Sequence, residues 1–220
     1  LIASGWLALQ TGSGARPAMA TDTEARDTLT PKDRWIQRAW WLACAFVPSS
    51  LLVGVTTHIA TDVASVPFLW ALPLALYIST FIIVFSKTPA IRLDTANRLL
   101  PVAVAIAFFT LPSIITASLV ISLIISLLAL FLAAMVGHGA LAEQRPAANR
   151  LTEFYLVMSL GGVLGGAFNA LLVPVIFTSV IEYPLMLLAI LLLRPGLRWM
   201  GVGRTRVWAI AAVTALFGAI

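Results

Sequence analysis

The stretch ASLVISLIISLLALFLAAMVG (117–137) decides the fold, because it runs without a single charged residue. A helix needs about 20 apolar residues to cross the ~30 Å hydrocarbon core of a bilayer, whereas a soluble surface helix of this length would show a polar face. The whole chain agrees, since 60% of its 220 residues are apolar and only 10% are charged, against about 25% charged in a typical soluble domain. We therefore predict a polytopic membrane protein, and exclude a disordered chain, a coiled coil and a disulfide-rich secreted scaffold.

Five further apolar blocks lie along the chain, at about 39–60, 63–86, 99–115, 154–177 and 180–193, the last of them short for a membrane span. Each should be an α-helix, because a helix satisfies its own backbone hydrogen bonds inside lipid. The predicted fold class is all-α, a polytopic transmembrane helix bundle with six complete spans and a partial helix at each end. The expected segments are the end of a preceding transmembrane helix (1–9), a cytoplasmic linker (10–38), a six-helix transmembrane module (39–194), a basic cytoplasmic loop (195–206) and the start of a further transmembrane helix (207–220).

The charge distribution predicts the orientation of the spans. The chain carries 14 Lys and Arg residues and a formal net charge of +5. All of these basic residues fall on alternate connections, whereas the connections near 62–65, 112–117 and 178–182 hold none. By the positive-inside rule the basic side is cytoplasmic. A basic patch for anionic lipid is compatible with this pattern, and nucleic acid is not an expected partner.

Polar residues in or near apolar blocks are the candidates for function, because an ionisable group costs energy in lipid. His58 and Asp62 lie four residues apart, so on one helix they can share a hydrogen bond and carry a proton or bind a cationic group. Alternatively, the pair lies at the outer boundary, caps the helix and meets water. Glu182, next to Pro184 on the predicted outer side, either pairs with His58 or is a solvated loop carboxylate.

The segment 137–146 (GHGALAEQRP) is predicted to be a loop on the cytoplasmic side. Its His138 stands between two glycines, which favours a cytoplasmic gate or a partner contact. Further on, Thr152 could be the N-cap of the next helix, and Glu153 suits a helix N-terminus electrostatically.

The fifth block contains a doubled pattern of small residues. Gly161, Gly165 and Asn169 form one row with a spacing of four, and Gly162 and Gly166 form the next. Such rows allow another helix backbone to approach closely in a membrane. We expect helix packing here, with Asn169 either hydrogen-bonding across the contact or lining a cavity.

Three stretches together resemble one family: FVPSSLLVGVTTHIATDVASVPFLWALPLALYISTFIIVF (46–85), HGALAEQRPAANRLTEFYLVMSLGGVLGGAFNALLVPVIF (138–177) and EYPL (182–185). They resemble the membrane part of bacterial fused MFS-transporter-like/spermidine-synthase-like proteins. The resemblance implies a helical module of the bacterial inner membrane, followed in full-length members by a cytoplasmic domain of aminopropyltransferase type. Seven residues match polar positions of that family: His58, Asp62, His138, Glu153, Tyr155, Asn169 and Glu182.

The chain departs from this family in lacking any synthase domain, since it has no strand–GxGxxG–helix unit and no acidic active-site loop. We therefore assign no catalytic residue, and expect no metal site and no cofactor. Cys44 is the one cysteine, so no internal disulfide can form. Three functions stay open: a structural or accessory subunit that binds other membrane subunits through the Gly-rich helix, a transporter-type module for a small polar or cationic solute, and a membrane anchor for a cytoplasmic synthase-like domain.

Overall fold

The structure is a computed structural model, and it describes residues 30–63, 68–86, 91–110, 119–176 and 182–194. The predicted segments 1–9, 195–206 and 207–220, with most of the predicted linker, lie outside the described residues. The chain divides into two compact units, residues 1–37 and 38–220. The helix contacts given below all belong to the second unit.

Helix α3 (Pro31–His58) begins earlier than the sequence predicted. The Thr30 hydroxyl accepts a hydrogen bond from the Asp33 backbone N–H at 3.2 Å and donates one to the Asp33 carboxylate at 2.6 Å. This is the N-terminal capping arrangement, and Pro31 suits the first helical position because its missing N–H is not needed there. The helix therefore includes residues 31–38, which the sequence had suggested were linker.

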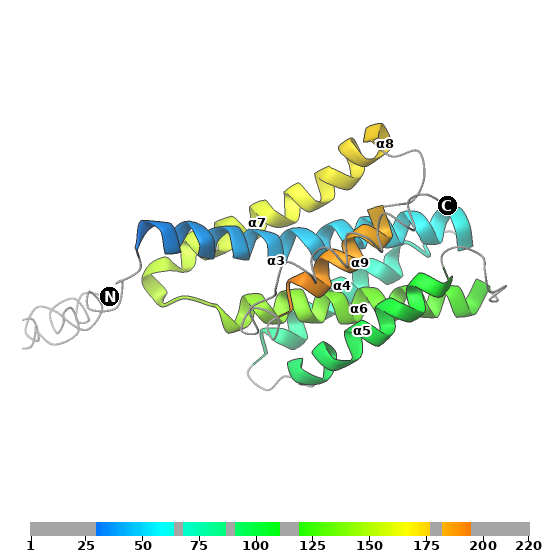
Figure 1. The fold of residues 1–220 in the computed structure, drawn as a ribbon, viewed down its shortest axis with the longest axis horizontal. Helices are drawn as coiled ribbons and strands as arrows, with labels where there is room; N and C mark the ends of the chain where they lie inside the picture. Colours follow the sequence, from blue (N-terminus) through cyan, green and yellow to red (C-terminus); the bar gives the residue numbers. More distant parts are fainter. Residues whose placement is uncertain (1–29, 64–67, 87–90, 111–118, 177–181, 195–220) are drawn as a thin grey trace, which may run out of the picture. The chain divides into compact units, whose positions relative to one another are not determined.

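Helices follow one another along the rest of the described chain (Figure 1). They are a π-helical turn η1 (Ile59–Val63), α4 (Ala71–Val84), α5 (Leu93–Thr110), α6 (Leu119–Glu143), a 3-10 turn η2 (Ala148–Arg150), α7 (Leu151–Ala167), a π-helical turn η3 (Phe168–Leu172), α8 (Val173–Ile176) and α9 (Glu182–Leu192). Each of the six predicted apolar blocks overlaps one of these helices. The all-α fold class is therefore confirmed for the described residues.

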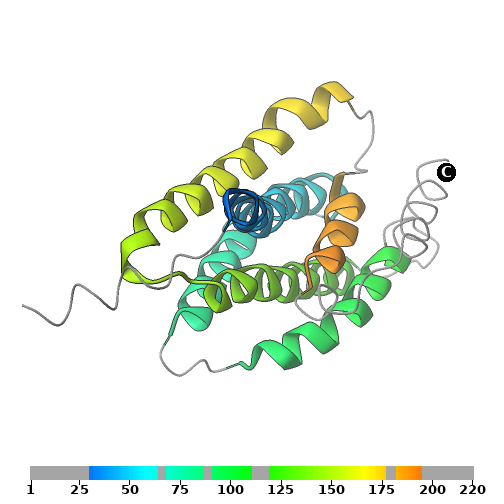
Figure 2. The ribbon, with the colours of Figure 1, turned by 60° about the vertical axis from the view of Figure 1, so that its left-hand side comes forward.

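Successive long helices of the second unit run in opposite directions, so that α3, α5 and α7 start at the end of the bundle where α4, α6 and α9 finish (Figure 1). Figure 2 shows α3 between α7 on one side and α6 and α9 on the other. Helix α6 packs against α4, α5 and α9. The largest buried apolar cluster lies among these helices and includes Leu51, Val55, Leu130, Met135 and Leu187.

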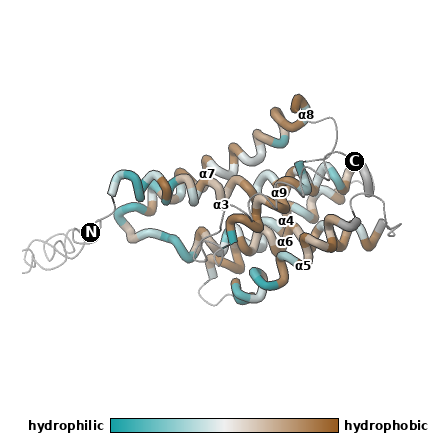
Figure 3. Tube along the Cα trace, in the orientation of Figure 1, coloured by the Kyte–Doolittle hydropathy of each residue, from teal (hydrophilic) through white to brown (hydrophobic). Residues whose placement is uncertain are grey.

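Three helices are long and apolar enough to cross a membrane: residues Pro31–Thr61, Val120–Glu143 and Ala148–Ile176. Helices α4 and α9 are apolar but shorter, and α5 is polar in its first turns. Figure 3 shows hydrophilic residues at the connection between α6 and α7 and at the start of α5, and hydrophobic residues along α6 and α8. The described residues thus support three spans, and the six predicted spans stay a prediction.

Helix α6 continues to Glu143, past the predicted end at Gly137, so the predicted loop 137–146 is wrong in its first half. Ala140, Leu141 and Ala142 are good helix formers, and the helix ends shortly before Pro146, where the restriction on the preceding residue favours a break. Gly137 lies inside this helix, close to α3. A side chain at this position would collide with Pro48 and lie 3.0 Å from the Cys44 carbonyl oxygen. The glycine is therefore needed for close helix packing.

Candidate functional site

One face of α7 lies directly against α3. A methyl group at Gly161 would lie 2.5 Å from the Leu42 carbonyl oxygen, and one at Gly165 would lie 3.0 Å from the Ser50 backbone nitrogen and closer still to the Phe46 carbonyl oxygen. These neighbours are backbone atoms, which cannot turn aside as a side chain can. Glycine is therefore the residue that fits at both positions, and it lets the two helix backbones approach closely.

Polar groups bridge the same α3–α7 seam. The Asn169 side-chain amide, 7% exposed, donates hydrogen bonds to the Ser50 carbonyl oxygen at 2.9 Å and to the Ser50 hydroxyl. The Ser49 hydroxyl donates to the Gly162 carbonyl oxygen at 2.8 Å. Asn169 lies in the π-helical turn η3, a distortion that is common at functional positions. The structure thus places Asn169 in a bond across the helix contact, which was one of the two predicted roles.

The second glycine row faces away from α3. A methyl group at Gly162 or at Gly166 would meet no atom of the described residues within 4 Å, leaving out the helix's own neighbouring backbone. The large apolar residues around this row are exposed, among them Leu156 at 69%, Val163 at 68% and Leu171 at 68%. In the most apolar 18-residue stretch of each helix, the buried share is 22% for Ala148–Ile176 and 50% for Val120–Glu143. One face of α7 therefore contacts α3, and the other is open as far as the described residues of the chain are concerned.

At one end of the seam, Glu153 binds two arginines. Its carboxylate accepts a hydrogen bond from the Arg38 guanidinium of α3 and one from Arg150 at 3.0 Å. The Arg150 guanidinium lies 5.6 Å from the centre of the Trp41 ring, and Trp41 meets Phe154 edge-on at 5.1 Å. The predicted N-cap role of Thr152 does not fit, because the capping residue of α7 is Arg150 and no side chain makes the cap bond. Glu153 thus joins α7 to α3 by charge.

Tyr155 lies on α7 two residues after Glu153, which forms the ion pairs with Arg38 and Arg150. It is 39% exposed, and its ring meets Phe154 at 5.3 Å. No described contact links its hydroxyl to another predicted polar position. Tyr155 therefore lies at the edge of the ion-pair cluster and on the more open side of the helix.

Near the opposite end of α3, His58 and Glu182 are both buried, at 6% and 4% exposed. The His58 ring stacks on Tyr183 at 5.4 Å, and a methyl group at Gly54 would lie 3.6 Å from the Tyr183 Cα. Glu182 is in the first turn of α9, so its predicted alternative as a solvated loop carboxylate is wrong. The His58 side chain likewise packs between helices rather than meeting water. The side chain of Asp62 lies outside the described residues.

His138 is buried inside the bundle, with no exposed area. Its Nδ1 lies 2.8 Å from the Thr80 hydroxyl of α4, and its ring stacks on Phe81 at 3.6 Å and meets Tyr77 edge-on at 4.9 Å. A residue enclosed in this way cannot contact a partner, which corrects that alternative, whereas the role of a cytoplasmic gate stays a prediction. It joins α6 to α4 instead.

The hydrogen bonds of Thr80 indicate which nitrogen of His138 carries the proton. The Thr80 hydroxyl has one hydrogen, and it donates it to the Tyr77 carbonyl oxygen at 2.7 Å. We infer that His138 Nδ1 is the donor to Thr80, which leaves Nε2 as an acceptor in the neutral ring. Nε2 is buried and has no hydrogen-bond partner among the described residues.

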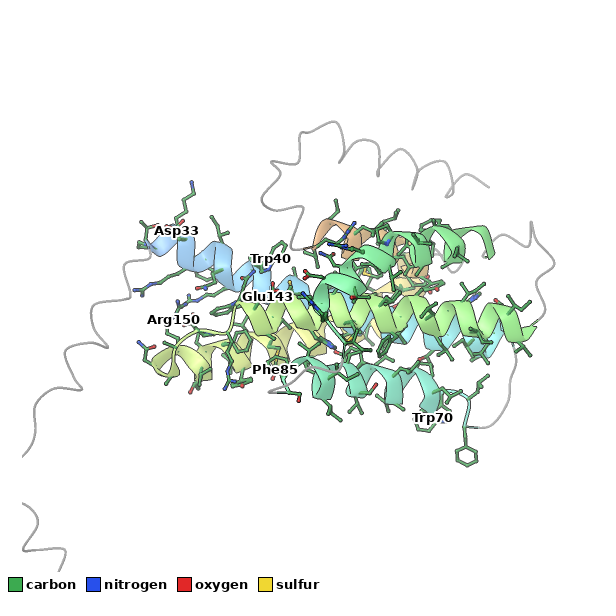
Figure 4. All side chains as sticks on the ribbon, turned by 90° about the horizontal axis from the view of Figure 1, so that it is seen from below. Asp33, Trp40, Trp70, Phe85, Glu143 and Arg150 are labelled. Carbon is green, nitrogen blue, oxygen red and sulfur yellow. The ribbon has the colours of Figure 1, made fainter. Side chains whose placement is uncertain are left out.

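Charged residues gather at the end of the bundle where α5 and α7 start. There the Arg194 guanidinium, just after α9, donates to the Asn97 side chain at 2.7 Å and to the Asn97 carbonyl oxygen at 2.6 Å. Figure 4 shows Arg150 far from Trp70, which lies at the opposite end. The Arg194–Asn97 contact therefore joins the end of α9 to the first turns of α5.

Sequence reasoning missed several of these contacts. Arg150 precedes Glu153 by three residues, a spacing that could have suggested the ion pair. Arg38 is 115 residues from Glu153 and gave no such signal. Thr80, one of two adjacent hydroxyl residues in an apolar block, was a weak signal for a partner of His138.

The predicted polar positions thus lie in three places. Glu153 lies at one end of the α3–α7 seam, and His138 lies between α4 and α6. Asn169 lies near the group of His58 and Glu182, because a methyl group at Gly54 of α3 would lie 3.7 Å from the Asn169 side-chain oxygen and 3.6 Å from the Tyr183 Cα. No protein-family model, no curated protein and no solved structure matches this chain.

Proposed function

We propose that the chain is a helical module of a bacterial inner membrane that acts as a structural or accessory subunit, packing through α7 against another membrane protein. The open face of α7 carries this proposal. One glycine row of α7 is filled by α3, and the adjacent row, Gly162 and Gly166, has free space beside it. In lipid, rows of small residues promote helix association by van der Waals packing, so a second row is a ready contact for a further helix.

The polar contacts support a structural role. Asn169 with Ser50, His138 with Thr80 and Glu153 with Arg38 each join two helices of the same chain. Such bonds hold membrane helices together at about 0.6 kcal/mol each on average. In the proposed orientation the arginine-rich helix ends face the cytoplasm, and six helices span the bilayer.

The test is to replace each outer glycine by leucine. Gly162→Leu or Gly166→Leu should release the chain from its assembly, observed on native gels after extraction in a mild detergent. Both variants should keep the thermal stability of the free chain, because the Cβ of the new side chain has no described atom within 4 Å, apart from the neighbouring backbone of its own helix. Ala105→Leu is the matched control, because Ala105 is exposed on α5. An assembly that survives both glycine variants contradicts the proposal.

A transporter-type module for a small polar or cationic solute is the second candidate, and the buried group of His58, Glu182 and Tyr183 favours it. A buried carboxylate within a helix bundle is unusual unless it binds or moves a charge. Uptake of radiolabelled spermidine into proteoliposomes should then be lost in Glu182→Gln and His58→Ala, with Glu143→Gln, an exposed carboxylate, as control. Uptake that is absent in the wild type, or unchanged in both variants, removes this candidate. A membrane anchor for a synthase-like domain is compatible with either function.

A further inference from the structure

A cavity of about 410 Å³ opens beside the start of α5, at the arginine-rich end of the bundle. Its described lining consists of Arg92, Asp94, Thr95, Arg98 and Leu99. None of these residues takes part in the α3–α7 seam. The cavity is therefore separate from the surface proposed to bind another subunit.

The charges around the cavity favour an anionic ligand. Arg92 and Asp94 are 3.6 Å apart and mainly exposed, at 82% and 75% of their side chains. Arg98 is also exposed, and no described residue pairs with its guanidinium. The described lining thus contains two guanidinium groups and one carboxylate. Of the neighbouring charges, Glu143 acts on Asp94 from α6, and Arg194 is held by Asn97.

Below the cavity, α5 presents an exposed apolar strip. Leu99, Val102 and Ile106 are 51%, 57% and 46% exposed. Spacings of three and four residues place all three on one helix face, together with Thr95 of the cavity lining. Because each residue rises 1.5 Å along the helix, the strip is about 10 Å long between its ends. A cationic cavity therefore continues directly into an apolar surface that runs toward the membrane interior.

We propose that this surface binds an anionic phospholipid, with its phosphate against Arg92 and Arg98 and an acyl chain along Leu99, Val102 and Ile106. Guanidinium groups bind phosphate oxygens through paired, charge-assisted hydrogen bonds. The apolar strip favours a lipid over a free phosphate ion, because an ion gains nothing from Leu99 and the residues below it. The inference shares with the proposed function the placement of the helices in a membrane, but it does not depend on a partner for α7.

The experiment measures lipid retained by the purified full chain in detergent, by native mass spectrometry, with phosphatidylglycerol and phosphatidylcholine added in parallel. The wild type should bind phosphatidylglycerol in preference. Arg92→Gln/Arg98→Gln should weaken this binding about thirtyfold, since each arginine near an anionic surface gives roughly a fivefold gain. Arg92→Lys/Arg98→Lys, which keeps the charge and loses the paired geometry, should weaken it less.

Arg145→Gln is the matched control, because Arg145 is an exposed arginine at the same end of the bundle and outside the cavity. An equal loss in this control would show a general charge effect and overturn the proposal, as would unchanged binding in the Gln double variant. Val102→Ser should also lower lipid retention. Displacement of the lipid by inorganic phosphate, with Val102→Ser without effect, would identify a free anion instead. Gly162→Leu, which tests the proposed subunit contact of α7, should leave lipid retention unchanged. Failure of the proposed function can therefore be distinguished from failure of lipid binding.

Discussion

Two neighbouring glycines of α7 should respond in opposite ways to the same small substitution. In Gly165→Ala, the new methyl group meets the Phe46 carbonyl oxygen and lies 3.0 Å from the Ser50 nitrogen, so α7 has to withdraw from α3. Overpacking of this kind costs about 1–3 kcal/mol. Withdrawal also stretches the Asn169–Ser50 bonds one turn further along, which adds about 0.6–1.7 kcal/mol. In Gly166→Ala the methyl group enters open space, and the higher helix propensity of alanine stabilises by up to about 1 kcal/mol.

The assay is thermal denaturation of the full chain in detergent, followed by size-exclusion chromatography of a fluorescent fusion. At about 2–4 °C per kcal/mol for a chain of this size, Gly165→Ala should lower Tm by roughly 3–19 °C. Gly166→Ala should leave Tm unchanged or raise it slightly. Equal shifts for the two variants would refute the assignment of one row to α3 and the other to the open face.

The remaining predictions use the same denaturation assay. Glu153→Gln should cost about 1 kcal/mol, a loss that shrinks in 1 M salt because the Glu153 and Arg38 side chains are 26% and 35% exposed; a loss independent of salt would contradict the ion pair. Asn169→Ala should cost about 0.6–1.7 kcal/mol, and Ser50→Ala added to it should cost little more, whereas fully additive losses would show that the two residues act separately. His138→Ala should cost about 2–4 kcal/mol through the cavity it leaves, and His138→Phe about 1 kcal/mol through the lost Thr80 bond; similar losses in the two variants would argue against ring packing on Phe81.

The helices themselves could be predicted from apolar runs, because lipid leaves the backbone few alternatives to a helix. The positions of the helix ends were harder to predict. Thr30 and Asp33 cap α3 within what composition suggested was a linker. Gly137 and Gly139 suggested a loop, yet both lie inside α6. A methyl group at Gly137 would collide with the Pro48 ring and lie 3.0 Å from the Cys44 carbonyl oxygen, whereas one at Gly139 would meet the end of the Leu93 side chain, which can turn aside. At position 137 glycine marks a close neighbour, and a single sequence does not distinguish this from a turn.

The sequence indicated which glycine and polar residues are candidates for the site, but not which helix each of them faces. The two glycine rows of α7 are equivalent in spacing, so the sequence alone could not tell which row, that of Gly161 or that of Gly162, faces α3. The burial of Glu182 and His58 depends on α9 returning to the end of α3, a contact between segments more than a hundred residues apart. Long-range contacts of this kind depend on tertiary packing, which periodicity does not encode.

The α3–α7 seam also has a consequence for how the protein is made. Ser50 and Asn169 are 119 residues apart, so α3 is synthesised long before the helix that covers it. At about 5–20 residues per second, the Ser50 face of α3 waits roughly 6–24 s for α7 to emerge from the ribosome. During that time its hydroxyl and backbone groups must be shielded by the insertion machinery or by a temporary helix neighbour. Biosynthetic quality control therefore has a long opportunity to act at this face, and defects at Gly165 or Asn169 should shorten the lifetime of the newly made chain.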